Sequence, residues 1–378
     1  MLVYRTRECI VQPLTNDRAY IAHIFFTSTT IRKVCVSHSQ PWPSPAKLNL
    51  FLHITGRRSD GYHELQSAFQ LIEFSDTLFF SVRGDGEIDL QCDDPSLAVP
   101  DNLVCRAAQA LRQTTGCTLG VSIHLQKKIP MGAGLGGGSS NAATTLVALN
   151  KLWQLGLSCA ELEQIGLTLG ADVPVFVRGV SAWAEGIGEI LQPLQLPQRW
   201  FVVLNPAIHI TTAELFNDRQ LTRDCSPITI RGFQDGEPTQ NVFEAVVRKR
   251  HTEVDFALVS LSEVAAALNL EGQNSHALDC QEPDVQELCL GPRMTGTGSS
   301  VFLACESEAM ARKVLTGVYK RYRNGSTITE SSATHFSFDE GSGKSSSKGS
   351  SKSSGKGISG FVTRGIQQSP LIAALGGL

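Results

Sequence analysis

The feature that most constrains this chain is a glycine-rich stretch between two segments of different periodicity. Residues 130–141 read PMGAGLGGGSSN, in which five of twelve positions are glycine. Residues 121–125 alternate apolar and polar side chains, which predicts a strand. After the glycines, apolar residues recur at spacings of four, three and four, which predicts a helix with one apolar face (Ala142, Leu146, Leu149, Trp153). The expected order is strand, glycine loop, helix.

This loop is expected to bind an anion such as phosphate. Glycine adopts positive φ and lets a ligand approach the backbone closely. A helix N-terminus presents unpaired N–H groups and a partial positive charge, and Ser139, Ser140 and Asn141 add polar groups there. A glycine loop can also be a plain turn, but this density of glycine before Ser-Ser-Asn favours an anion site.

Three familiar phosphate loops fit poorly. Gly132, Gly134 and Gly137 match the dinucleotide fingerprint, yet residues 158–162 open another helix where that fingerprint needs a second strand and an acid. The protein-kinase loop requires valine where Ser139 stands. A P-loop requires lysine after the glycines, and this loop has none.

Outside the loop, two charged residues occupy positions suited to a site. Residues 46–54 predict a strand, on which Lys47 and Asn49 share one face because side chains alternate. Asp172 follows a predicted helix over 159–169, at a junction of the kind that often holds site residues. The alternatives are a lysine whose ammonium reaches solvent and an aspartate that caps a helix or turn.

The remaining pattern predicts further elements. Residues 78–82 and 87–91 flank Gly84-Asp85-Gly86 and predict a hairpin. Residues 102–111 predict a helix, residues 241–270 predict two, and a strand near 201–204 begins a second domain. We expect a surface loop at 272–291. Residues 341–357 contain only Gly, Ser and Lys, so we expect disorder there.

Composition narrows the class of protein. The length of 378 residues predicts two domains. A net charge of −3 gives no sign of a nucleic-acid surface. Ten cysteines without a C-x-x-C pair predict neither a zinc site nor a disulfide framework, and scattered thiols suit a reducing cytosol. No apolar run is long enough to span a membrane. We therefore expect a cytoplasmic protein with no metal-binding cluster of its own.

Several stretches together resemble the GHMP kinases, the superfamily of galactokinase, homoserine kinase, mevalonate kinase and phosphomevalonate kinase. The glycine loop is similar to the central motif of that superfamily, and residues 293–302 resemble its third motif. The other matching stretches are similar to the branch that acts on 4-diphosphocytidyl-2-C-methyl-D-erythritol (43–52, 57–65, 169–176, 360–362, 369–371).

The resemblance implies an α+β fold of two domains with the active site in the cleft between them. Residues 1–40 would be an N-terminal extension, which we expect to be disordered. Residues 41–198 would form the ATP-binding domain and residues 199–378 the C-terminal domain, with the Gly/Ser/Lys insertion at about 323–358.

The resemblance also implies the reaction, the transfer of the γ-phosphoryl of ATP to a hydroxyl of the cytidyl substrate in non-mevalonate isoprenoid synthesis. Asp172 would be the base, with Lys47 beside it. Asn49, Tyr62, His63 and Phe216 would bind the substrate, with Tyr62 and Phe216 on the two faces of the cytosine and His63 hydrogen-bonded to it. The nucleotide would be bound by the loop (Pro130, Met131, Gly132, Ala133, Gly134, Leu135, Gly136, Gly137, Gly138, Ser139, Ser140). Mg²⁺ would arrive with ATP, with Ser139 or Ser140 contacting the metal or a phosphate, and no tightly bound cofactor is expected.

Two rival hypotheses remain open. The chain could be another GHMP kinase, for example one acting on homoserine or mevalonate, although Tyr62, His63 and Phe216 suit a substrate that carries a base. It could also be a non-catalytic nucleotide-binding protein of this fold, against which the presence of both Lys47 and Asp172 argues. We expect small-molecule partners only, neither nucleic acid nor membrane, and a monomer or homodimer.

Overall fold

The computed structural model describes residues 40–268, 291–324 and 358–374, all within one compact unit, His38–Leu378. Apart from their end positions, three segments with sequence-based predictions lie outside the described residues. They are the N-terminal extension at 1–40, the loop at 272–291 and the insertion at 323–358.

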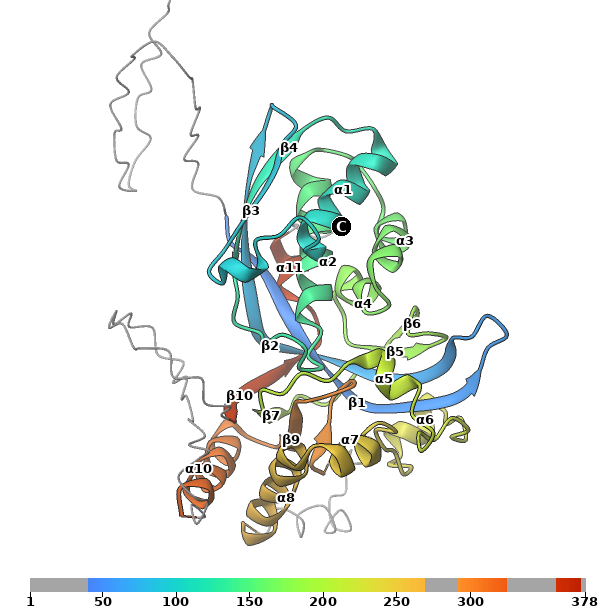
Figure 1. Cartoon of the computed structure of the whole chain (residues 1–378), viewed down its shortest axis with the longest axis vertical. Helices are drawn as coiled ribbons and strands as arrows, with labels where there is room; N and C mark the ends of the chain where they lie inside the picture. Colours follow the sequence, from blue (N-terminus) through green and yellow to red (C-terminus); the bar gives the residue numbers. More distant parts are fainter. Residues whose placement is uncertain (1–39, 269–290, 325–357, 375–378) are drawn as a thin grey trace, which may run out of the picture. The chain divides into compact units, whose positions relative to one another are not determined.

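The described residues build one mixed sheet that runs through both halves of the chain, the first half being the described residues of 41–198 and the second those of 199–374 (Figure 1). Its main path has the order β3-β4-β2-β10-β7-β9-β8, and only the β3–β4 pair is parallel. The strands on this path are β3 (Ile88–Cys92), β4 (Gly120–Gln126), β2 (His63–Arg83), β10 (Ser359–Ile366), β7 (Trp200–Asn205), β9 (Val301–Cys305) and β8 (Arg293–Met294). Off the path, β1 (Trp42–Arg57) and β5 (Ala182–Glu185) pair with β2, and β6 (Ile190–Pro193) pairs with β5.

The predicted hairpin around Gly84-Asp85-Gly86 is wrong. Strands β2 and β3 do not pair, because β4 lies between them and bonds to both. The alternation in β4 buries Val121, Ile123 and Leu125 against the helices. A strand with such a continuous apolar face is better buried between two neighbours than at an edge, and β3, which is only half-buried, takes the edge.

In the first half, four helices lie on one side of the sheet (Figure 1). They are α1 (Leu103–Thr115), α2 (Gly137–Leu152), α3 (Cys159–Leu169) and α4 (Val173–Arg178), and a short 3₁₀ helix, η1 (Pro95–Leu97), precedes α1. Two of the four, α1 and α2, pack against strands, and the other two, α3 and α4, pack against these helices. The predicted helices at 102–111 and 159–169 are confirmed; Asn102 caps α1, and α3 ends at Gly170.

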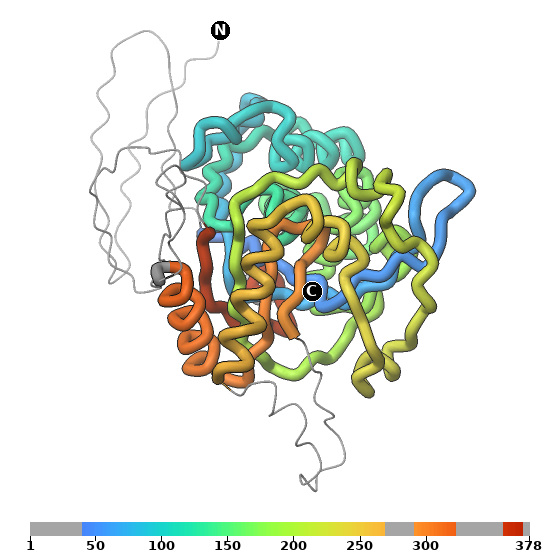
Figure 2. The backbone as a smooth tube through the Cα atoms, turned by 60° about the horizontal axis from the view of Figure 1, so that its bottom comes forward, coloured from blue at the N-terminus to red at the C-terminus, as the bar shows by residue number. Residues whose placement is uncertain are grey.

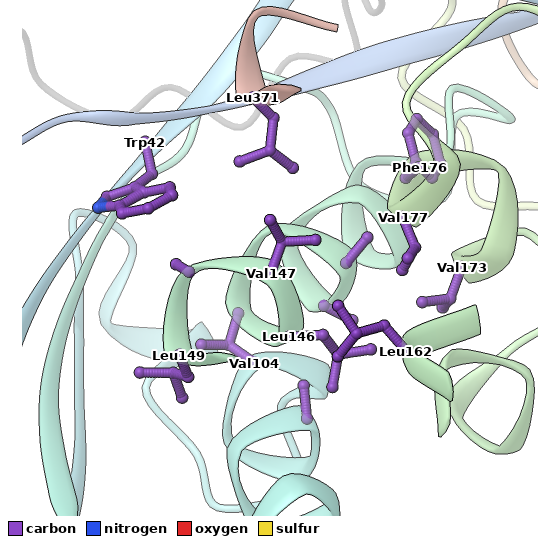
Figure 3. Packing of buried hydrophobic residues seen from close by; sticks show 14 of the residues in the cluster. Trp42, Val104, Leu146, Val147, Leu149, Leu162, Val173, Phe176, Val177 and Leu371 are labelled. Atoms are coloured by element: carbon purple, nitrogen blue, oxygen red, sulfur yellow. The ribbon is translucent and has the colours of Figure 1, made fainter. Parts of the chain in front are cut away.

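The core of this half is built around α2. Its apolar face was predicted from the spacing of Ala142, Leu146, Leu149 and Trp153, and all four are buried. Figure 3 shows Leu146 and Val147 of α2 among residues from α3, α4 and the C-terminal α11. The helix that follows the glycine loop is therefore fixed on several sides.

The second half pairs its part of the sheet with a different set of helices. They are α5 (Thr212–Phe216), α6 (Ile230–Gln234), α7 (Glu244–Arg250), α8 (Thr252–Ala267) and α10 (Glu308–Asn324). Two helices within 241–270 are confirmed as α7 and α8, and the strand near 201–204 as β7. Helices α8 and α10 lie side by side against β9 and β7 (Figure 2). A mostly antiparallel sheet with helices packed on it confirms the predicted α+β class.

The C-terminal segment joins the two halves. Strand β10 pairs with β2 through Gly365 and Ile366, and with β7 along most of its length. Helix α11 (Pro370–Ala374) then carries Leu371 into the core around α2. The predicted domain boundary at residue 198 stays a prediction. Residues 358–374, which that boundary assigns to the second domain, contact both halves.

Candidate active site

A cavity of about 720 Å³ lies between the two halves, lined by residues from both. The first half contributes β1, the glycine loop and the start of α4, and the second half contributes α5 and residues 296–297. Nine of the residues predicted for the site line this cavity: Lys47, Asn49, Tyr62, His63, Gly134, Gly136, Ser139, Asp172 and Phe216.

Lys47 and Asp172 face each other in the cavity. The Nζ atom of Lys47 lies 3.4 Å from an Oδ of Asp172, and the two side chains are 3% and 35% exposed. Asp172 stands at the N-cap position of α4 but makes no side-chain capping bond. The two alternatives that the sequence left open are therefore wrong: Lys47 does not reach solvent, and the Asp172 carboxylate does not cap α4.

A chain of hydrogen bonds through Asn49 and Ser67 holds the Lys47 side chain in place. Lys47 and Asn49 share one face of β1, as predicted, and Nζ of Lys47 donates to Oδ1 of Asn49. The side-chain nitrogen of Asn49, Nδ2, donates to Ser67 Oγ (2.8 Å), which in turn donates to the Phe51 carbonyl (2.6 Å). Both ends of the Asn49 amide are therefore engaged by protein, and its substrate-binding role stays a prediction.

The glycine loop has the predicted place between β4 and α2, and its shape requires glycine. Gly134 and Gly136 have φ of 73° and 72°, a region that L side chains avoid. A Cβ on Gly134 would clash with the Thr295 carbonyl oxygen, and one on Gly136 would lie 3.1 Å from the Lys47 side chain. The glycine loop thus lies against both Lys47 and residues 295–298, which belong to the stretch that resembles the third motif of the superfamily.

The two loop serines differ in their surroundings. Ser139 lines the cavity, whereas Ser140 is fully buried and accepts a hydrogen bond from Ser44 (2.8 Å). This favours Ser139 for the contact with phosphate or metal. The other loop residues do not line the cavity; Met131 is well exposed, and Ala133 and Leu135 are buried (Pro130, Met131, Gly132, Ala133, Leu135, Gly137, Gly138, Ser140).

The opposite end of the cavity is aromatic. The rings of His63 and Phe216 are stacked with centroids 5.0 Å apart, and Phe243 meets Phe216 edge-on. Tyr62 is 62% exposed at the rim. Burial lowers the pKa of His63, and the charges of Arg223 and Arg57 lower it further. A neutral imidazole carries one donor and one acceptor, so this end can recognise a polar ring.

Several lining residues were not assigned from the sequence. Gly296 and Thr297 line the cavity, and Asn241 donates to the carbonyls of Met294 and Gly296 (2.8 Å each). The Thr-Gly-Thr-Gly run at 295–298 was the available signal. Arg57 and Arg223 also line the cavity. Arg57 opens the matching stretch at 57–65, which was a signal for it, whereas nothing in the local sequence of Arg223 distinguishes it from a surface arginine.

The oxygen donors of the site fit a magnesium ion that enters with a nucleotide. The Asp172 carboxylate and the Ser139 hydroxyl both line the cavity, and Mg²⁺ usually binds through one or two carboxylates together with substrate phosphates. Among the described residues, no group of three or more His, Cys, Asp or Glu is arranged to hold a metal.

The described helices also include none long and apolar enough to cross a membrane.

Comparison with known proteins defines the class. Residues 102–180 match the model of the GHMP kinases N terminal domain. This match covers α1, the glycine loop, α2 and Asp172. The fold is that of a GHMP kinase, a class of ATP-dependent small-molecule kinases.

The relatives narrow this class further. The chain is 52% identical over 272 residues to the 4-diphosphocytidyl-2-C-methyl-D-erythritol kinase of Pseudomonas syringae pv. syringae, covering 72% of this chain and 87% of the relative. It is 49% identical over 274 residues to the enzyme of the same name from Nitrosococcus oceani, covering 72% and 89%. A crystal structure of 4-(cytidine 5'-diphospho)-2C-methyl-D-erythritol kinase is 30% identical with a TM-score of 0.60, over 74% of this chain and 96% of that one. The chain belongs to the 4-diphosphocytidyl-2-C-methyl-D-erythritol kinase family.

Proposed function

We propose that this chain transfers the γ-phosphoryl group of ATP to a hydroxyl of 4-diphosphocytidyl-2-C-methyl-D-erythritol, giving the 2-phosphate for non-mevalonate isoprenoid synthesis. The observation that carries the proposal is the Lys47–Asp172 pair in a cavity with a glycine loop and an aromatic end. A phosphate donor and a base-bearing acceptor each have a matching part of one cavity. The cytoplasmic location and the monomer or homodimer state remain inferences from the sequence.

At the phosphate end, the loop at 130–140 would bind the nucleotide through backbone N–H groups and the N-terminus of α2. Gly134, Gly136 and Ser139 of this loop line the cavity. Gly134 and Gly136 have positive φ and no side chain, so a phosphate could approach the loop backbone closely. Mg²⁺, when bound, would neutralise charge on the β and γ phosphates, and Ser139, which lines the cavity, would contact the metal or a phosphate.

In the reaction, Asp172 would take the proton of the substrate hydroxyl as its oxygen bonds to the γ-phosphorus. The bond from that phosphorus to the β–γ bridging oxygen breaks, and ADP leaves. Lys47 donates to Asn49 and lies 3.4 Å from Asp172, so its ammonium is held where negative charge develops. A buried, pre-positioned cation stabilises such charge far better than one in water.

At the aromatic end, Tyr62 and Phe216 would stack on the cytosine and His63 would hydrogen-bond to it. All three line the cavity, and aromatic rings bind bases by stacking. Mevalonate and homoserine carry no base, so this end supports the cytidyl substrate over those of other GHMP kinases.

A coupled assay of ADP release tests the proposal. We expect turnover with the cytidyl substrate and none above background with mevalonate or homoserine. Turnover with mevalonate instead would reassign the acceptor. If ADP did not bind in calorimetry, the nucleotide site itself would be wrong.

A further inference from the structure

Asp76 is a fully buried carboxylate in the middle of β2. It does not line the cavity and takes no direct part in the reaction described above. A buried carboxylate is costly unless every acceptor position finds a donor, so its partners indicate why the fold tolerates it.

The Asp76 carboxylate accepts four hydrogen bonds, and all four donors come from residues next to the two ends of the glycine loop. One oxygen accepts from the backbone N–H groups of Lys128 (2.6 Å) and Ile129 (2.8 Å), immediately before the loop. The other accepts from Lys127 Nζ (2.7 Å) and Asn141 Nδ2 (2.9 Å). Asn141 lies in the first turns of α2, immediately after the loop, so one carboxylate holds both the entry and the exit.

The same network extends into the loop. Lys127 Nζ also donates to the Ile129 carbonyl (2.6 Å). A Cβ on Gly137 would lie 3.0 Å from that Nζ and 2.9 Å from the Ile129 side chain. On the exit side, Asn141 also donates to Ser44 Oγ (2.9 Å), which donates to Ser140 Oγ. Residues on both sides of the glycines are therefore connected through Asp76 by one network of hydrogen bonds.

We propose that Asp76 is a positioning residue for nucleotide binding: its carboxylate fixes the distance between the two ends of the glycine loop and so the direction of the loop N–H groups. The inference rests on the proposed function, because it concerns the nucleotide of that reaction. Glycine-rich backbone is intrinsically free, so its order has to come from the residues that hold its ends. Small displacements of groups that orient a substrate reduce activity steeply.

Asp76→Asn tests the inference because it keeps the shape and replaces one acceptor oxygen with an NH₂ group that faces donors. The matched control is Glu163→Gln, which changes another largely buried carboxylate of the same half, paired with Arg178 (2.7 Å) and absent from the cavity lining. Calorimetry on folded protein, well below each thermal midpoint, measures dissociation constants for ADP and for the cytidyl substrate.

We expect Asp76→Asn to weaken ADP binding about tenfold or more and to change the affinity for the cytidyl substrate less than about twofold. Glu163→Gln should leave both affinities unchanged even if its thermal midpoint falls. In turnover, Asp76→Asn should raise KM for ATP and leave KM for the cytidyl substrate unchanged. A merely structural role would lower the thermal midpoint without this selectivity.

A second variant covers the case in which Asp76→Asn does not fold. Asn141→Ala removes only the exit-side donor and should weaken ADP binding selectively, by about threefold to tenfold. Unchanged ADP affinity in the variant that folds, or an equal loss for both ligands, overturns the positioning role. Wild-type protein that binds no ADP would overturn the proposed function and the inference with it, whereas equal, tight ADP binding by wild type and variant overturns the inference alone.

Discussion

The two ends of the cavity are built in different ways. At the phosphate end, Lys47 is almost fully buried and Asp76 and Ser140 are completely so, and each makes hydrogen bonds to other parts of the fold. At the aromatic end, Tyr62 is 62% exposed and follows a polar turn held by the Arg58–Asp60 contact on the surface.

The difference follows from what each end has to do. Charge that develops during phosphoryl transfer is stabilised most by groups that need no rearrangement, which favours a buried and fully bonded support. Recognition of a base depends on contact area, and the exposed Tyr62 side chain can change rotamer to fit it. We therefore expect substitutions at the phosphate end to reduce turnover and those at the aromatic end to reduce affinity.

The largest effect is expected for Asp172→Asn. Loss of the base and of its charge should lower kcat by about two to four orders of magnitude, while ADP still binds. Single-turnover kinetics and ADP calorimetry measure the two quantities. Asp93→Asn, at an exposed carboxylate paired with His124 outside the cavity, is the control. Near-normal turnover in Asp172→Asn would remove this residue from the mechanism.

Lys47→Met should give the next largest loss. Methionine fills the buried space, so the fold is retained, but the cation beside Asp172 is gone; kcat should fall by about two to three orders of magnitude. Lys313→Met on the exposed side of α10 controls for loss of one positive charge. If Lys47→Met abolished ADP binding and left the chemical step intact, Lys47 would belong to the phosphate site instead.

Tyr62→Ala and Phe216→Ala probe the aromatic end. Each removes a stacking face, which contributes about 1–3 kcal/mol for a base, so KM for the cytidyl substrate should rise about tenfold or more and KM for ATP should not. The control is Phe256→Ala, at an exposed ring on α8 that contacts Tyr322 and not the cavity. A selective rise in KM for ATP would mean that the two ends are assigned the wrong way round.

The smallest effect concerns His63 and pH. Its pKa is lowered from 6.5, first by burial and then by Arg223 and Arg57. The unfolded chain therefore takes up a proton more readily, and stability is lost as pH falls below about 6.5. Above that pH the His63 imidazole is neutral in both the folded and the unfolded chain, so its titration does not change the free energy of unfolding.

The measurement is the thermal midpoint of wild type minus that of His63→Gln, from pH 7.5 to pH 5, so that other titrating groups cancel. We expect this difference to shift against the wild type by a few degrees or less at low pH. The affinity for the cytidyl substrate should likewise fall only below about pH 6.5. A difference that does not vary with pH would show that His63 is not held neutral.

Local pattern was enough to predict some of this architecture. The strand, glycine loop and helix at 121–153 follow from spacing alone, as does the shared face of Lys47 and Asn49, because both depend on residues close in sequence. The order β3-β4-β2 could not be predicted in this way. It depends on which strand buries most apolar surface, and that is decided by residues distant along the chain.

The site divides along the same line. The role proposed for Asp172 came from family resemblance, because the local sequence alone favours a helix or turn cap. The ion pair with Lys47 and the missing capping bond separate the two interpretations only in the structure. Asp76 was not singled out at all. An acid within an apolar strand was the available signal, but its partners at 127–141 lie more than fifty residues away.

The position of β10 has a consequence for synthesis of the chain. The strand that bonds to both β2 and β7 is made from residues 359–366, so it leaves the ribosome after all the other described strands of the sheet. Domains commonly fold in order as they emerge, and here the first half can bury α2 long before the sheet is joined. The two walls of the cavity acquire their shared support only after residue 366 has been translated, so a nascent chain stopped at residue 324 is expected to hold folded helices but no competent kinase.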